Sequence, residues 1–149
     1  MAIKMEKDSL GYLFIKICKN RRNIANEMLA GFGIHAGQDV LLYYLSRKDG
    51  QTISELVKNI CVQHATISNM ISRMEANGLI SKLKDDRDMR VSRIYLTGKG
   101  RTAMNKIEKV WDSLEQQTIE GFLPEEEKKL KKLLQQVLRN LDQKFSEDG

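Results

Sequence analysis

Residues 65–77 carry a group of small and polar side chains whose spacing suggests contact chemistry. Drawn as a helix, this segment places Ile67, Met70, Ile71 and Met74 on one face and small or polar residues on the other. Small residues let a helix approach the floor of a DNA major groove, asparagine can pair with adenine, and hydroxyls reach phosphates or base edges. Taken alone, the helix is better explained as an ordinary amphipathic helix with a solvated face, and the contact interpretation depends on the tight preceding helix and the basic hairpin that follows. The candidate contact residues are His64, Thr66, Ser68, Asn69, Ser72 and Arg73.

A second group of candidates is basic and lies between residues 82 and 101. This stretch contains seven Lys/Arg and three Asp/Glu, so it carries a net charge of +4. Arginines on a hairpin can follow a phosphate backbone or enter a minor groove, where the narrow negative channel favours a guanidinium. The candidates are Lys82, Lys84, Arg87, Arg90 and Arg93.

Three aspartates between residues 85 and 88 admit another interpretation, a divalent metal site for nuclease chemistry. Arg87 and Arg90 alternate with these carboxylates and neutralise them, and no histidine lies nearby to complete the ligand shell. His35 and His64 lack metal-ligand spacing. The sequence also lacks a glycine-rich phosphate loop and a nucleophile–base pair. We therefore expect no enzyme, no metal and no cofactor.

The elements that position these residues are mainly helical, because apolar residues recur every three or four positions. Two short helices with a tight connection predict a helix-turn-helix, and the two strands after them predict a small β-hairpin. The last helix begins at Pro124, where proline loses no hydrogen bond. The expected elements are helices at 8–30, 34–47, 52–60 and 65–77, strands at 79–83 and 91–96, a long helix after 97–100, and a helix from 124.

The last helix has a nearly pure Leu/Val stripe between residues 130 and 145, which must be buried somewhere. Packing within one chain is the simple explanation. We favour packing of the first and last helices against a second copy, because a DNA-reading core of 55 residues is too small to cover both. A homodimer is therefore predicted. A helical module that binds another protein through this stripe is an alternative.

The length and composition of the chain fit a single globular domain that binds a polyanion. The chain has 149 residues, 41% hydrophobic and 30% charged, which corresponds to one globular domain. Residues 47–101 contain eleven Lys/Arg and six Asp/Glu, so this segment alone accounts for the net charge of +5 and favours a polyanion as partner. No apolar run is long enough to span a membrane. Two cysteines without a CxxC motif favour a reducing, cytoplasmic location.

Three further residues have ambiguous roles. Arg21 interrupts the apolar stripe of the first helix, where it either pairs with an anionic ligand or forms a salt bridge. Cys18 lies on the same stripe and is interpreted as a buried structural thiol. Cys61 precedes the helix at 65–77 and is interpreted as a small core residue.

The run from Asp88 to Thr97 reads D-x-R-x-x-x-[VI]-x-L-T, which resembles the signature of the MarR (multiple-antibiotic-resistance-regulator) family. Gly33-Ile34 followed by Gln38-Asp39-Val40-Leu41 and the run from Met74 to Ile80 also resemble this family, as does the order of elements over essentially the whole chain.

This resemblance implies a winged helix-turn-helix fold of about six helices in an intertwined homodimer. It implies a sequence-specific regulator, most often a repressor, that binds an inverted repeat in double-stranded DNA and responds to a small anionic or phenolic effector. By position, Arg90 becomes the minor-groove arginine of the wing and Asp88 the carboxylate that orients it. Residues 34–101 become the DNA-binding part, and 1–33 with 102–149 the dimerisation part. A nonspecific architectural DNA-binding protein is the alternative.

Overall fold

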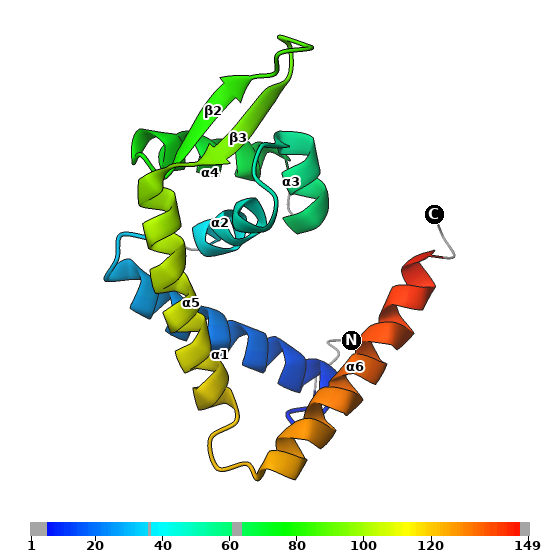
Figure 1. The fold of residues 1–149 in the computed structure, drawn as a ribbon. Coiled ribbons are helices and arrows are strands. Elements are labelled where there is room, and N and C mark those ends of the chain that lie inside the picture. The colour runs from blue at the N-terminus through cyan, green and yellow to red at the C-terminus, as the bar shows by residue number, and fades with distance from the viewer. Residues whose placement is uncertain (1–5, 36, 61–63, 147–149) are drawn as a thin grey trace. The chain divides into compact units, whose positions relative to one another are not determined.

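The computed structural model describes residues 6–35, 37–60 and 64–146, with side chains up to Asp142. The chain divides into two compact units, one ending at Leu114 and one beginning at Glu115. None of the helices in the described part of the chain is both long and apolar enough to cross a bilayer. The described elements, labelled in Figure 1, are α1 (Leu10–Ala30), α2 (Gln38–Arg47), β1 (Gln51–Thr52), α3 (Ile53–Ile60), α4 (His64–Ala76), β2 (Ile80–Lys84), β3 (Ser92–Leu96), α5 (Gly98–Thr118) and α6 (Pro124–Ser146).

The predicted helices and hairpin strands are confirmed, with ends shifted by a few residues. Local capping explains why α3 begins where the sequence predicts. The Thr52 hydroxyl accepts a hydrogen bond from the Glu55 backbone N–H at 3.2 Å, and Glu55 Oε2 accepts one from the Thr52 N–H at 3.0 Å. This reciprocal pair satisfies two donors that the start of α3 would otherwise leave unpaired.

The sheet has one strand more than the sequence predicts. β2 and β3 form the antiparallel hairpin, with Ile80 opposite Leu96 and Lys84 opposite Ser92. The unexpected β1 pairs with the other edge of β3, so the order is β1-β3-β2. A strand of two residues carries no alternation that a sequence could reveal, and its pairing is decided by the distant β3.

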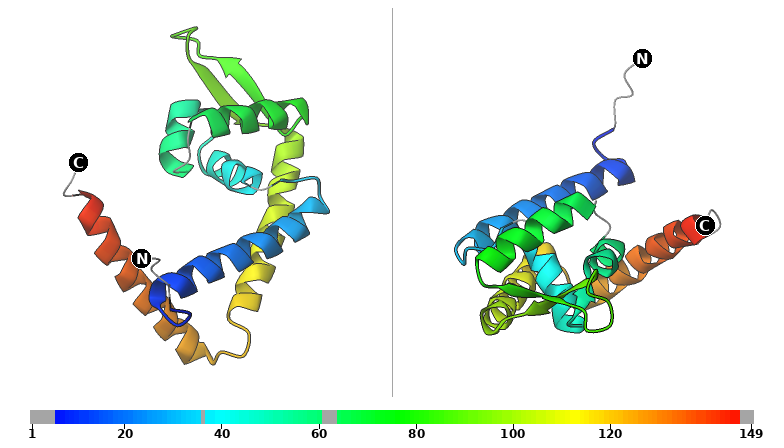
Figure 2. Two further views of the ribbon diagram at one scale, coloured as in Figure 1. Left: turned by 180° about the vertical axis from the view of Figure 1, so that it is seen from behind. Right: turned by 90° about the horizontal axis from the view of Figure 1, so that it is seen from above.

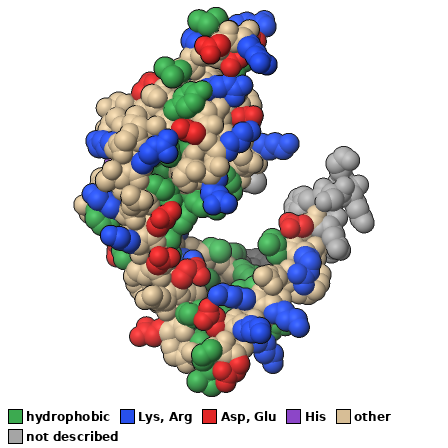
Figure 3. Space-filling view, viewed as in Figure 1, with side chains coloured by type: hydrophobic (Ala, Val, Ile, Leu, Met, Phe, Trp, Pro, Cys, Tyr) green, Lys and Arg blue, Asp and Glu red, His purple; other side chains and the backbone are tan. Residues whose placement is uncertain are grey.

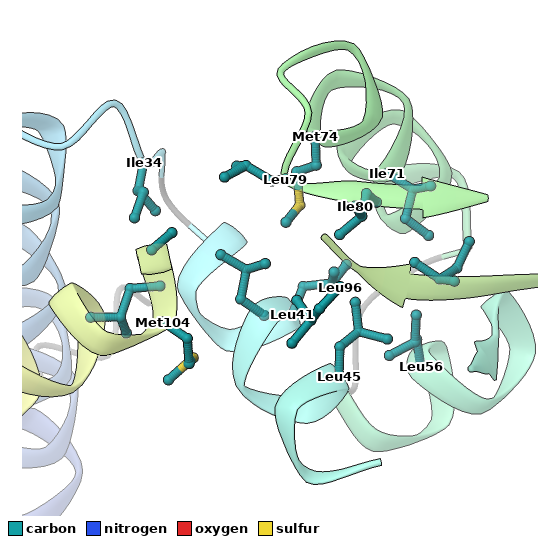
Figure 4. Close-up of a cluster of buried hydrophobic side chains, with 14 of the residues drawn as sticks. Ile34, Leu41, Leu45, Leu56, Ile71, Met74, Leu79, Ile80, Leu96 and Met104 are labelled. Carbon is teal, nitrogen blue, oxygen red and sulfur yellow. The ribbon is translucent and has the colours of Figure 1, made fainter. Parts of the chain in front are cut away.

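The core of the winged-helix part is formed by α2, α3, α4, the hairpin and the first half of α5. Figure 4 shows their apolar side chains converging between α2 and the sheet. The three residues of α4 that face this core, Ile67, Ile71 and Met74, are at most 1% exposed. The predicted inward face of α4 is therefore confirmed, and the opposite face of this helix is exposed to solvent.

A buried carboxylate joins α1 and α5 to α2. Asp39 is 1% exposed, and both of its oxygens accept hydrogen bonds from Arg22 Nη1 at 3.2 Å. Trp111 Nε1 donates to Asp39 Oδ2 at 3.1 Å. Since a buried carboxylate is costly without partners, these contacts hold the three helices in one arrangement. Arg21, the arginine that the sequence analysis assigned to an anionic ligand or a salt bridge, is the neighbour of Arg22 in the chain and is half-buried.

The junction between the hairpin and α5 depends on Thr97 and Gly100. The Thr97 hydroxyl donates to the Gly78 carbonyl at 2.6 Å and accepts the Gly100 N–H at 3.1 Å. A Cβ atom at Gly100 would lie 2.1 Å from the Leu79 carbonyl oxygen. Glycine is therefore required where the first turn of α5 meets the backbone before β2.

Much of the apolar surface of α1 and α6 is exposed in the single chain. The buried residues of α1 are Ala25 and Leu29, both in its C-terminal half. The predicted burial of Cys18 is wrong for the single chain, because the thiol lies on the exposed N-terminal half. Cys61 lies outside the described residues. The most exposed apolar side chains of the two helices are Leu10, Ile15, Ile17, Leu133, Leu138 and Leu141, which are 48–71% exposed.

Candidate nucleic-acid interface

The outward face of α4 carries most of the predicted contact residues. Seen from behind in Figure 2, α4 lies across the base of the β2–β3 hairpin. Its C-terminal end is tied to the hairpin, because Glu75 Oε2 accepts a hydrogen bond from the Lys82 backbone N–H at 3.0 Å. Ser68 is half-buried, and the other predicted residues of this face are exposed: His64, Thr66, Asn69, Ser72 and Arg73.

Hydrogen bonds within α4 separate these side chains into two kinds. The Ser72 hydroxyl donates to the Ser68 carbonyl at 3.1 Å, so its proton is engaged within the helix. Ser68 Oγ lies 3.4 Å from His64 Nδ1 at the N-terminal end of α4. Asn69 and Thr66 make no such side-chain bond within the described residues, so both can offer donors and acceptors to an external partner.

Asp88 holds Arg90 at the tip of the wing, the name used here for β2, β3 and the loop 85–91. Arg90 Nε donates to Asp88 Oδ1 at 3.0 Å, and Arg90 Nη2 donates to Asp88 Oδ2 at 3.2 Å. These bonds lower the pKa of the Asp88 carboxyl below its usual value. The Arg90 side chain is 91% exposed, so the pair fixes the direction of a guanidinium that remains open to solvent.

Arg93 makes a second pair at the base of the wing loop. Its Nε donates to Asp85 Oδ1 at 2.9 Å, and its Nη1 donates to the Gly50 carbonyl at 3.0 Å. The Arg93 hydrogen bond is the main reason why the pKa of Asp85 is lowered, and the same bond raises the pKa of Arg93. Arg93 was predicted among the contact residues, and the structure places its guanidinium against the protein's own turn before β1.

Sequence reasoning missed the role of Asp85. It was grouped with Asp86 and Asp88 as one acidic cluster, whereas the structure pairs Asp85 with Arg93 and Asp88 with Arg90. The hairpin spacing contained the signal, because Leu83 pairs with Arg93 and Lys84 with Ser92, which makes Asp85 and Arg93 diagonal neighbours on one face of the hairpin. Within the described residues, no group of three or more His, Cys, Asp or Glu is arranged to hold a metal.

Three basic side chains remain exposed along the wing: Lys82, Lys84 and Arg87. Within the residues that the structure describes, none of them forms a salt bridge. Figure 3 shows Lys and Arg side chains gathered around the protruding end of the hairpin. Since exposed unpaired cations can neutralise phosphates, the wing has the charge expected of a backbone contact.

Comparison with known proteins identifies the family. The model of the MarR family matches residues 34–92, which run from just before α2 to the first residue of β3. The HTH-type transcriptional regulator YsmB of Bacillus subtilis, whose name marks it as uncharacterised, is 31% identical over 117 residues, covering 76% of this chain and 80% of YsmB. The chain belongs to the MarR family. In this MarR-family chain, α4 and the wing lie next to each other and are joined by the bond between Glu75 and Lys82.

Two solved structures with DNA resemble this MarR-family chain. The MepR–DNA complex of S. aureus matches with a TM-score of 0.79 and 28% identity, covering 89% of this chain and 98% of MepR. A mutant of MarR from E. coli in complex with operator DNA matches with a TM-score of 0.78 and 25% identity, covering 87% of this chain and 93% of that chain.

Proposed function

We propose that this chain is a transcription regulator that binds double-stranded DNA sequence-specifically as a homodimer. The observation that carries this function is the exposed polar face of α4 beside a wing with unpaired cations, in a MarR-family chain. The similarity to MepR and MarR, both solved with DNA, supports the same partner. The regulator has no enzymatic activity, and its location is the cytoplasm.

In this proposal α4 enters the major groove. Asn69 is the principal base reader, because an exposed amide can form two hydrogen bonds with one adenine. Arg73 contacts a phosphate or a guanine. The hydroxyl and imidazole groups of the same face position the helix on the backbone: His64, Thr66, Ser68 and Ser72.

The wing contributes a second set of contacts. Arg90 enters the minor groove, where its guanidinium is attracted most strongly when the groove is narrow. Lys82, Lys84 and Arg87 neutralise phosphates. Asp88 keeps Arg90 extended before binding, and Arg93 keeps the wing loop in place through Asp85 and Gly50.

The homodimer places two such readers on one inverted repeat, with half-sites about one helical turn apart. The exposed apolar side chains of α1 and α6 form the dimer contact, because monomeric proteins rarely leave large apolar patches exposed. Residues 34–101 read the DNA, and 1–33 with 102–149 dimerise. The regulator acts as a repressor by occupying a promoter, and a small anionic or phenolic effector releases it.

Selection of bound duplexes from a random pool at near-physiological salt tests this function. The expected result is an inverted repeat with a defined spacing between half-sites. The control is the variant in which Lys84 and Arg87 are replaced by methionine, which should retain the same consensus with weaker binding. A pool without a consensus, bound with a steep salt dependence, would indicate the alternative of an architectural protein.

A further inference from the structure

A β-turn at the tip of the wing has Met89 and Arg90 as its two central residues. The Val91 N–H donates to the Asp88 carbonyl at 2.9 Å, which closes the turn around them. Asp88 Oδ1 also accepts the Arg90 backbone N–H at 3.0 Å, a bond that aspartate commonly makes in turns. In Figure 1 the loop between β2 and β3 lies at the protruding end of the hairpin. Both side chains therefore lie at the outermost corner of the wing.

The rest of the wing loop holds this turn in place. The Asp85 N–H donates to the Val91 carbonyl at 2.9 Å, at the base of the loop. Asp85 Oδ2 accepts the Asp88 N–H at 3.2 Å, while Asp85 Oδ1 accepts the bond from Arg93 of β3. Because these bonds already fix the loop in the single chain, little conformational entropy is lost when its tip binds a partner.

Met89 places an apolar side chain at a corner that is otherwise charged. It is 66% exposed, so burial in the fold does not account for an apolar residue here. Arg87 is exposed on one side of it in the chain, and the Arg90 side chain on the other side is 91% exposed. Figure 3 shows hydrophobic side chains beside Lys and Arg at this end of the hairpin. A complementary partner must offer negative charge and an apolar surface together.

The minor groove of DNA offers both properties. Its narrow segments have a strong negative potential, and its walls consist of deoxyribose carbons. Proteins that bind there often insert an apolar side chain between two base pairs, which partly unstacks them and kinks the duplex by about 20–90° toward the major groove. Methionine is one of the side chains used in this way, and its flexible thioether adapts to irregular gaps.

We propose that Met89 enters the minor groove beside Arg90 and partly unstacks one base step under each wing. This inference rests on the proposed DNA binding and deepens it, because Met89 would read the deformability of DNA rather than its hydrogen-bonding groups. Pyrimidine–purine steps, TA and CA/TG, unstack most easily, so the wing selects them without a hydrogen bond to a base. Arg90 supplies the attraction to the groove, and Met89 selects the step.

The test uses the full-length protein and the inverted repeat recovered by selection. In a set of duplexes, 2-aminopurine replaces one adenine at a time outside the half-sites, and its fluorescence rises when it unstacks. Energy transfer between dyes at the two ends of the duplex measures the bend, and anisotropy measures binding. We expect a fluorescence rise at one step on each side of the repeat, together with a kink of about 20–90° at that step.

Matched variants decide whether Met89 is responsible. Met89→Ala should weaken binding about tenfold through lost apolar contact and abolish the fluorescence rise. It should leave the slope of log affinity against log salt unchanged, because methionine neutralises no phosphate. Met89→Leu keeps an apolar side chain of similar volume and should retain the rise. The control is Leu83→Ala, which removes a 56% exposed apolar side chain of β2 and should unstack the step as the unaltered protein does.

The outcomes separate this inference from the proposed function. If selection returns no inverted repeat, the proposed function fails and Met89 has no groove to enter. If the unaltered protein binds the repeat but no 2-aminopurine position brightens, DNA binding stands and the insertion of Met89 is overturned. Full affinity and an unchanged rise in Met89→Ala would overturn it as well. Loss of the rise in Leu83→Ala would do the same, because the effect would then not be specific to the tip.

Discussion

Asp39 and Arg22 form the link between α2 and α1, with both carboxylate oxygens of Asp39 at 3.2 Å from one guanidinium nitrogen. Trp111 of α5 bonds to the same carboxylate. One buried side chain of α2 thus joins this helix to both α1 and α5. The strength of this link can be measured through the stability of the folded protein.

Replacement of Asp39 by alanine should lower the free energy of unfolding by about 2–4 kcal/mol, because the Trp111 N–H and the Arg22 guanidinium, both partly buried, lose their buried partner. Because the Arg22 side chain is partly exposed, the loss in free energy of unfolding should be smaller than for a fully buried ion pair. Urea unfolding followed by circular dichroism measures the change. Asp112→Ala, at an exposed aspartate of α5, is the control and should stay within about 0.5 kcal/mol.

Asn69→Ala should weaken binding to the selected inverted repeat by about 1–3 kcal/mol and binding to random duplexes far less, because base contacts specify sequence while phosphate contacts only position the protein. Fluorescence anisotropy with both duplexes measures the difference. Asn105→Ala, at an exposed asparagine of α5, should change neither affinity. Equal losses on the two duplexes would contradict the role of Asn69 as a base reader.

Arg90→Ala should weaken binding most on duplexes that are A/T-rich where the wing lies, because a narrow minor groove attracts a guanidinium most strongly. The measurement compares the affinity of the variant on two duplexes that differ only at these positions. Asp88→Asn is the companion variant, which keeps Arg90 but removes the charge that orients it. If A/T-rich and G/C-rich wing positions give the same loss for Arg90→Ala, Arg90 does not enter the minor groove.

Arg93 and Lys84 should differ in the salt dependence of DNA binding. Lys84→Met should reduce the slope of log affinity against log salt by about 1, as expected for one lost phosphate contact. Arg93→Met should leave this slope unchanged while lowering affinity, because its guanidinium is bonded to Asp85 and Gly50. A reduced slope for Arg93→Met would instead place this arginine on a phosphate.

The wing should lose stability in acid. The Arg93 hydrogen bond lowers the pKa of Asp85 from its ordinary 3.8, and the Arg90 bond does the same for Asp88. A carboxyl whose pKa is lower in the folded state stabilises the fold fully above the unfolded value, and this contribution disappears as pH falls through the lower folded value. Carboxyl ¹³C NMR between pH 5 and about 2 should show both groups titrating below 3.8. Arg93→Met should return Asp85 toward 3.8.

The elements whose position is decided locally could be predicted from the sequence. Thr52 and Glu55 cap α3 through bonds within four residues, and the apolar spacing of α4 gave its buried face. The D-x-R-x-x-x-[VI]-x-L-T run indicated the wing through its resemblance to the MarR family, and in the structure its threonine joins the hairpin to α5. The cap of α3 and the apolar side of α4 depend on neighbours in the chain, so no distant partner is needed to see them, whereas the bond from Thr97 to Gly78 spans 19 positions.

Features decided by distant partners could not be predicted. The pairing of β1 with β3 and the contact of Arg93 with Gly50 each join residues more than forty positions apart. Cys18 was misjudged because periodicity identifies an apolar side of α1 but not what covers it. Asp39 was noted in the sequence only as part of a run that resembles the family and was given no structural role, since a single carboxylate in a helix is ordinarily solvated.

In the proposed homodimer, the exposed leucines and isoleucines of α1 and α6 also determine how occupancy of an operator varies with the amount of protein. Where monomers predominate, the concentration of dimer rises with the square of the monomer concentration. Halving the cellular supply then lowers operator occupancy about fourfold at the low end of the curve, since each bound dimer consumes two chains. If the dimer forms through these apolar side chains as proposed, operator occupancy responds more than proportionally to the rate at which the protein is synthesised.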